Sequence, residues 1–168
     1  MLQRIRQARA GTGERGAAMV EFALILPVLM ALVFGMLTGG SAYNRQLSLT
    51  NAVREGSRFG ATLPGGATWA SDVQTRTVDA SSGDLSSTNQ VCVQLVKNGS
   101  VVTPTSSYSA LGSECSGLAA PTVTGTDCVV QVWARRLNGD KLQVIFFTTT
   151  LSLKSKSVAR YEKTVTGC

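Results

Sequence analysis

The feature that most constrains this chain is an uncharged run of 23 residues near its N-terminus, from Phe22 to Asn44. As an α-helix this run would rise roughly 35 Å, enough to cross a hydrocarbon core of roughly 30 Å. The core helix of a soluble protein rarely needs so long a run without a charge. The pattern therefore predicts one transmembrane helix over residues 17–42, in contact with membrane lipid.

A cleaved secretory signal is the alternative interpretation of the same run. Gly40-Ser41-Ala42 offers small residues of the kind that signal peptidase accepts. The apolar stretch is longer than the 7–15 residues of a signal sequence, so a retained anchor is favoured. The formal charge of +6 adds little, because the basic residues are scattered and have no aromatic side chains between them, which argues against nucleic-acid binding.

Charge leaves the orientation of the anchor nearly undecided. Four arginines precede the helix and three follow it closely: Arg4, Arg6, Arg9 and Arg15, then Arg45, Arg54 and Arg58. The cysteines decide it. Cys92, Cys115, Cys128 and Cys168 all follow the membrane segment, and an even number of cysteines in a small domain suits an oxidising compartment. We expect the N-terminus inside and the C-terminal domain outside the cytoplasm.

Disulfide bonds are the favoured role of these four cysteines. A zinc site would need closely paired cysteines or histidine partners, and the chain has neither. Free buried thiols are the other alternative. Three disulfide pairings are possible, and the sequence does not choose among them.

The residues that open the membrane helix are unusual in their order. Arg15 and Gly16 are followed by Ala17-Ala18-Met19-Val20 and then by Glu21-Phe22. A carboxylate deep in lipid is costly, by roughly 2.5 kcal/mol or more at a helix centre. The simplest interpretation is an interfacial glutamate at the cytoplasmic end of the helix, stabilised by the helix dipole.

The segment also resembles the family of TadE-like pseudopilins of the tight-adherence (Flp-type) pilus machinery. Residues 15–27 carry the resemblance, with Gly16, Glu21, Phe22 and Pro27 in the family's order, and it continues loosely through residues 44–61. The resemblance implies a basic prepilin-type leader at residues 1–16. A prepilin peptidase would cut after Gly16, so that Ala17 becomes the new N-terminus and Glu21 the fifth residue.

In pilin-like assemblies that glutamate can pair with the free α-amino group of a neighbouring subunit, which offsets part of the cost of two lone charges at the lipid boundary. Glu21 and Phe22 are accordingly the expected assembly residues. Ala31, Gly35 and Gly39 recur every four residues, a spacing that lets another helix approach closely. The implied partners are a prepilin peptidase, other pilin-like subunits and the pilus assembly machinery.

Beyond the membrane the helix is expected to continue as a stalk over residues 43–66, ending at Pro64-Gly65-Gly66. Thr68 is the expected N-cap of a short helix over residues 68–80, with Trp69 anchored in the core, and a loop follows at residues 81–89. Pro27 should bend the membrane helix.

The rest of the chain, residues 67–168, reads as an extracytoplasmic α+β domain with disulfides. Strands 91–97 and 101–103 flank Asn98-Gly99, and strands 128–136 and 141–153 flank Asn138-Gly139, so two hairpins are expected. A long polar loop over residues 104–127 contains Cys115. The predicted fold class is α+β, with a long N-terminal transmembrane and stalk helix packed on a small antiparallel β-sheet domain.

The chain has no histidine and no common nucleotide-binding or nucleophile motif, so we expect no catalytic residues, cofactor, metal or small-molecule substrate. Two functions remain. The first is a TadE-like minor pilin or pseudopilin that takes part in pilus assembly, at the cytoplasmic membrane or on the cell surface. The alternative is an uncleaved, single-pass surface module that binds a partner through its sheet domain. The two functions differ in whether the chain is cut after Gly16.

Overall fold

A computed structural model describes residues 12–123, 125–136, 140–144 and 147–168. By contacts the chain forms two compact units. The first comprises residues 1–40 with 142–149, and the second residues 41–141 with 150–168. The first eleven residues of the predicted leader lie outside the described residues. The fold class is α+β, as predicted.

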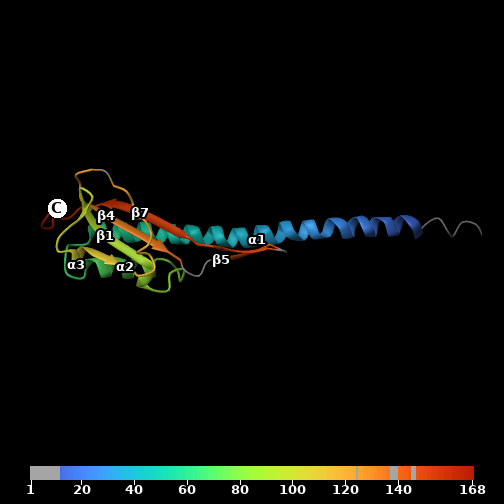
Figure 1. The fold of residues 1–168 in the computed structure, drawn as a ribbon, viewed down its shortest axis with the longest axis horizontal. Coiled ribbons are helices and arrows are strands. Elements are labelled where there is room, and N and C mark those ends of the chain that lie inside the picture. Colours follow the sequence, from blue (N-terminus) through green and yellow to red (C-terminus); the bar gives the residue numbers. More distant parts are fainter. Residues whose placement is uncertain (1–11, 124, 137–139, 145–146) are drawn as a thin grey trace, which may run out of the picture. The chain divides into compact units, whose positions relative to one another are not determined.

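The helix that carries the apolar run is α1, Thr12–Thr62 (Figure 1). It begins five residues before the expected Ala17, because Glu14, Arg15, Ala17 and Ala18 all favour helix. The helix continues through Pro27. Its end confirms the stop predicted at Pro64-Gly65-Gly66, where proline and glycines cannot extend the helical hydrogen-bond pattern.

The short helix predicted after this stop is α2, Trp69–Asp79, with Thr68 at its N-cap position. The Thr68 hydroxyl does not cap a backbone N–H. It donates a hydrogen bond of 2.9 Å to Oδ2 of Asp72. Trp69 is buried, and its indole N–H donates to the carbonyl of Gly60 in α1 at 3.1 Å. The expectation that Trp69 anchors the core is confirmed.

The second unit is built on an antiparallel sheet in the order β2-β1-β4-β7, with β3 also paired to β1. These strands are β1 Val91–Lys97, β2 Ser100–Val101, β3 Ser109–Leu111, β4 Val129–Arg135 and β7 Lys154–Arg160. The predicted hairpin at Asn98-Gly99 is confirmed, since Lys97 pairs with Ser100 and both turn residues have positive φ (50° and 77°).

The predicted pairing of the second hairpin is wrong. Among the described residues, strand β4 pairs with β1 and β7, and the predicted strand at residues 141–153 is not its ladder partner, apart from one hydrogen bond from the Arg136 N–H to the Leu153 carbonyl just beyond β4. That segment forms two strands, β5 Asp140–Val144 and β6 Phe147–Leu151, which pair with each other. The expected turn at Asn138-Gly139 lies outside the described residues. Strand β7 was not expected, because its inward positions are the small Ser155, Ser157 and Ala159.

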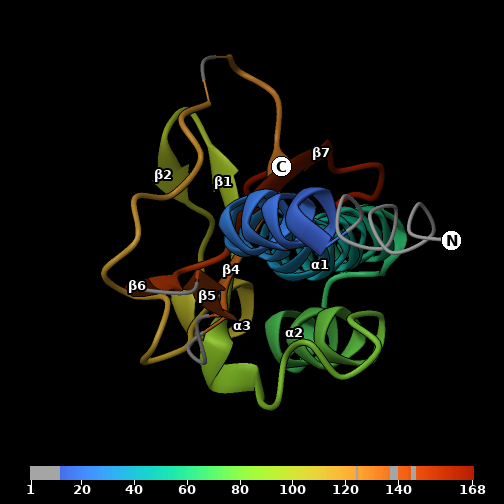
Figure 2. The ribbon, with the colours of Figure 1, turned by 90° about the vertical axis from the view of Figure 1, so that its right-hand side faces the viewer.

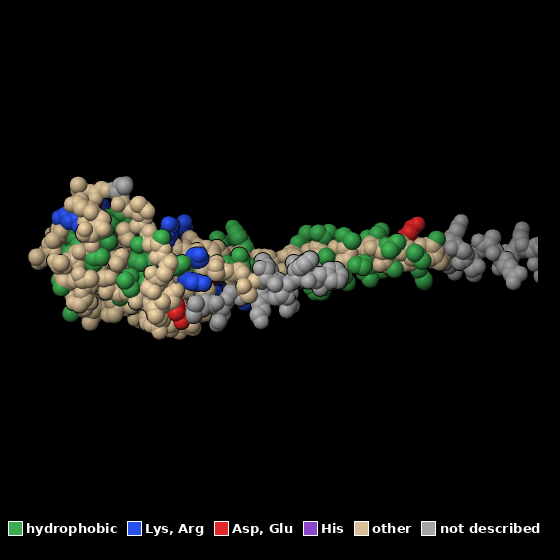
Figure 3. Space-filling model, viewed as in Figure 1, with side chains coloured by type: hydrophobic (Ala, Val, Ile, Leu, Met, Phe, Trp, Pro, Cys, Tyr) green, Lys and Arg blue, Asp and Glu red, His purple; other side chains and the backbone are tan. Residues whose placement is uncertain are grey.

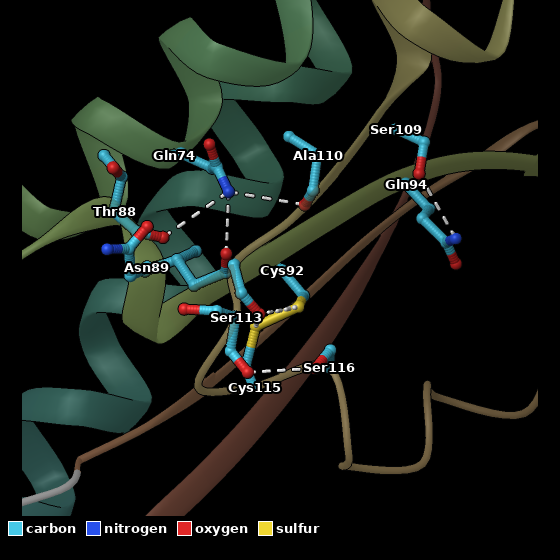
Figure 4. Close-up of a disulfide and its surroundings, with 12 residues drawn as sticks. Gln74, Thr88, Asn89, Cys92, Gln94, Ser109, Ala110, Ser113, Cys115 and Ser116 are labelled. Carbon is cyan, nitrogen blue, oxygen red and sulfur yellow. Dashed lines mark hydrogen bonds between the residues drawn. A yellow bond between two sulfur atoms is a disulfide. The ribbon is translucent and has the colours of Figure 1, made fainter.

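The expected loop at residues 104–127 is also partly ordered into elements. It contains the one-turn helix α3, Thr105–Tyr108, and strand β3. A 3-10 turn, η1 at Thr88–Gln90, ends the predicted loop at residues 81–89. The amide of Gln74 in α2 donates to the carbonyls of Val91 at 2.7 Å and Ala110 at 3.3 Å (Figure 4), so one buried side chain ties β1 and β3 to the helix.

One face of the sheet carries the core of this unit. Residues 41–62 of α1 and helix α2 pack on it, as the end-on view shows (Figure 2). The side chains on this face are alternate residues of β1 and β4, as the two-residue period of a strand requires. The core includes Leu49, Val53, Trp69, Val73, Val91, Val93, Leu95, Val130, Val132 and Ala134.

The other face of the sheet is covered in part by the segment after β3. A disulfide joins Cys92 of β1 to Cys115 (Figure 4). Both cysteines pack against Trp133 of β4. A second disulfide joins Cys128 to Cys168. The prediction of disulfides is confirmed and the pairing is resolved. Closing loops of 23 and 40 residues stabilises the fold by about 3–4 kcal/mol each in the chain-entropy account.

Candidate functional site

The predicted leader junction lies inside α1. Gly16 and Ala17 are both helical and exposed, with the helix starting four residues before Gly16. A Cβ built on Gly16 meets no atom within 4 Å, so in this structure the absence of a side chain is not required by packing. A helical peptide bond must open locally before a peptidase can bind it in an extended form. Glycine at position 16 lowers the cost of that opening.

Beyond the junction the surface of α1 is apolar. Green side chains cover this stretch of the helix in Figure 3. Among the described residues, Gly16–Thr62 is the one helix long and apolar enough to cross a membrane, and its most apolar window is unburied. Phe22 is 60% exposed and Leu24 is 72% exposed. A surface of this kind is unfavourable in water and suits lipid or other helices.

Glu21 is the one acidic residue between Gly16 and Arg54. It is exposed and has no ion-pair partner in the part of the chain that the structure describes. It lies one helical turn after Ala17, about 6 Å along the axis. An unpaired carboxylate at this position needs either water or a cation from outside the helix.

The small residues spaced by four, Ala31, Gly35 and Gly39, lie on the same side of α1 as this carboxylate. Eighteen residues make five full turns, so Glu21 has the same direction as Gly39, and Ala17 the same direction as Gly35. Ala31 lies within about 80° of both glycines. A Cβ at Gly35 or Gly39 would meet no atom within 4 Å among the described residues. The structure therefore brings Ala17, Glu21, Ala31, Gly35 and Gly39 to one open face, which we call the small-residue face.

Phe22 does not belong to this face. It follows Glu21 by one residue and so points about 100° away from it. The four cysteines are also separate from the helix site, since all of them are in the second unit and in disulfides. Their role in this structure is to hold the segment after β3 and the C-terminus.

One group of residues was not anticipated from the sequence. Arg135, Lys154 and Lys156 lie on the face of the sheet away from the helices. Trp133 is on that face, and Arg135 shares it because it is two residues further along β4. Lys156 and Lys154 share it as the cross-strand partners of Trp133 and Arg135. The alternation of lysine and serine in residues 154–157 is the signal that marks this strand, but the serines gave it no apolar face to recognise.

The comparison with family models matches residues 16–58 to the family described as TadE-like protein. The resemblance noted from the sequence is thereby confirmed over this segment. The match includes Gly16, Glu21, Phe22 and the small-residue face, and it ends within α1. No curated protein and no solved structure gives a significant match to this chain.

Proposed function

Since residues 16–58 are TadE-like, we propose that this chain is a minor pilin or pseudopilin of a tight-adherence pilus system. The observation that carries the proposal is the point at which the family match begins. It starts at Gly16, the residue before the proposed cut, and leaves the basic residues 1–15 outside. This is the division expected of a removable leader and a retained subunit.

The proposed maturation removes the leader between Gly16 and Ala17. The new α-amino group then lies one turn from Glu21, and both have the direction of the small-residue face. A charged pair formed between neighbouring subunits on this face offsets part of the cost of placing either charge at the lipid boundary. The glycines at 35 and 39 allow the two helices to approach closely while the pair forms.

The proposed topology places residues 1–16 on the cytoplasmic side and the second unit outside. The two disulfides support this orientation, because such bonds persist in oxidising compartments. The proposed partners are a prepilin peptidase, which removes the leader, and pilin-like subunits, which contact the small-residue face. Membrane lipid surrounds the rest of the apolar helix.

The proposal is tested by complementation in a cell whose pilus system has lost this chain. We expect the wild-type chain to restore pili counted by electron microscopy, and Glu21→Gln to be processed normally yet fail to restore them. Glu55→Gln is the matched control, because Glu55 is an exposed carboxylate that pairs with Arg76 at 2.7 Å in the second unit. Full piliation without the chain would contradict the proposal.

The alternative function is an uncleaved surface module anchored by the same helix. It requires neither the cut after Gly16 nor the carboxylate at Glu21. A chain that stays intact and acts normally with Gln at position 21 would favour this alternative.

A further inference from the structure

Strand β7 runs beside the part of α1 that belongs to the second unit. At its start, the amide of Gln46 donates to the carbonyl of Lys154 at 2.9 Å. Further along, the hydroxyls of Ser57 and Ser157 are 2.9 Å apart, and Tyr161 donates to the carbonyl of Leu63 after the strand ends. Lys154 therefore lies at the end of the unit where α1 enters it.

The outward face at this end carries three basic side chains. Arg135 and Lys154 are direct cross-strand partners, a placement of like charges that is unfavourable unless an anion lies nearby. Arg135 is half-buried, and its Nε is buried with no hydrogen-bond partner. Among the described residues, none of the three forms an ion pair. The neighbouring Arg136, by contrast, pairs with Asp84 at 3.3 Å.

A hollow opens beside these charges. It has a volume of about 290 Å³ and is lined by Leu118, Ala119, Trp133, Lys154, Ser155 and Lys156. Its lining contains two ammonium groups and no carboxylate. The Trp133 indole is buried in its wall, with an Nε1 that has no hydrogen-bond partner. Figure 3 shows Lys and Arg side chains gathered on the surface of this unit. The hollow and its rim suit an anionic group.

We propose that this hollow, with Arg135, Lys154 and Lys156, binds the headgroups of anionic phospholipids. The inference rests on the proposed membrane anchoring of α1. Gln46, which donates to the carbonyl of Lys154, is four residues beyond Ala42, where the proposed membrane segment ends, or about 6 Å along the part of α1 in the second unit. The headgroup layer on each side of the hydrocarbon core is about 5–8 Å deep, and a lysine side chain is long and flexible enough to place its ammonium group there. Basic groups at this depth attract an anionic leaflet.

The test uses the full chain in lipid nanodiscs made of phosphatidylcholine alone or with one third phosphatidylglycerol. A membrane-impermeant amine reagent labels the lysines, and peptide mass spectrometry gives the rate at each one. We expect labelling of Lys154 and Lys156 to be at least about threefold slower in the anionic discs, and to recover in high salt. Lys163, exposed beyond the opposite end of β7, serves as the internal reference.

A substitution separates binding at the hollow from the general effect of a charged surface. Arg135→Gln should remove most of the protection of Lys156 in anionic discs. Arg160→Gln is the matched control, because Arg160 lies at the far end of β7 and pairs with Asp127 at 3.6 Å. In Arg160→Gln, the protection of Lys156 should equal that in the wild type.

Two results would overturn the proposal. Equal labelling of Lys154 and Lys156 in both kinds of disc would show that lipid charge has no effect there. Equal or stronger protection by soluble polyglutamate in phosphatidylcholine discs would assign the hollow to an acidic protein segment. Failure of the anchoring itself has a different signature, since the chain would then not enter the discs at all.

Discussion

Gly56 of α1 lies directly against the side chain of Thr77 of α2, at the crossing of the two helices. A Cβ at position 56 would overlap the Thr77 hydroxyl. Thr77 is fully buried, and that hydroxyl donates to the carbonyl of Val73 at 2.7 Å, so it has little freedom to move. The crossing distance of α1 and α2 in the second unit therefore depends on a glycine at position 56.

We expect Gly56→Ala to lower the free energy of unfolding by about 1–3 kcal/mol. The overlap with Thr77 outweighs the gain of about 1 kcal/mol that alanine brings to a helix interior. Trp69 and Trp133 are both buried in this unit, so tryptophan fluorescence during chemical unfolding in detergent reports the change.

The same substitution in a Thr77→Ala background is the control. Removing the hydroxyl that meets the new methyl group should make Gly56→Ala less costly there than in the wild type. Equal costs in the two backgrounds would show that the destabilisation does not arise at this contact.

Tyr161 gives the second unit a dependence on alkaline pH. Burial raises the pKa of its phenol above the ordinary 10.0, and neighbouring Tyr108 raises it further, while a backbone hydrogen bond at Gly65 acts in the opposite direction. Above about pH 10 the folded chain keeps a proton that the unfolded chain releases. The free energy of unfolding should therefore fall as the pH rises from about 10 toward the pKa of the folded state.

We expect Tyr161→Phe to flatten this fall, measured by urea unfolding between pH 8 and 11. The variant also loses the hydrogen bond to Leu63, at a cost of about 1 kcal/mol below pH 9. Tyr43→Phe is the control, since Tyr43 is 66% exposed and its replacement should leave the slope unchanged. An unchanged slope in Tyr161→Phe would remove Tyr161 as its source.

If helices associate through the small-residue face, a large side chain added on this face should weaken association more than one added elsewhere on α1. Gly35→Leu should weaken association of the full chain in lipid, measured by energy transfer between labelled copies or with labelled pilin-like subunits, because the added side chain holds the helices apart. Gly40→Leu is the matched control. It makes the same change about 140° away, where a Cβ also meets no atom within 4 Å. Equal effects of the two variants would exclude a preferred face.

Most of the helical part of this fold was predictable from the sequence, because its signals are local. The apolar run set α1, Pro64-Gly65-Gly66 ended it, and the spacing of Trp69, Val73 and Thr77 set α2. The hairpin at Asn98-Gly99 was equally local. In each case the residues that decide the structure are neighbours in the sequence.

The sheet order was not predictable in the same way, because it depends on contacts distant in the sequence. Strand β7 fits beside α1 through Ser155 and Ser157, whose hydroxyls meet Thr50 and Ser57 about 100 residues away. Small polar side chains suit that close approach but carry no strand signal of their own. The cysteine pairing and the basic hollow depend on the same long-range arrangement, so neither could be read from spacing.

The central claim, that this chain is matured as a pilin-like subunit, depends on one peptide bond. The most direct measurement is the intact mass of the full chain, extracted from membranes after co-expression with a prepilin peptidase. Two controls are measured in the same way: co-expression with an inactive peptidase, and a Gly16→Leu variant, in which a side chain blocks the cut. We predict a chain that begins at Ala17 with the active enzyme, and an unprocessed chain in both controls. An unprocessed chain with the active enzyme would contradict this claim. So would a chain that begins at Tyr43, the product of signal-peptidase cleavage after Gly40-Ser41-Ala42.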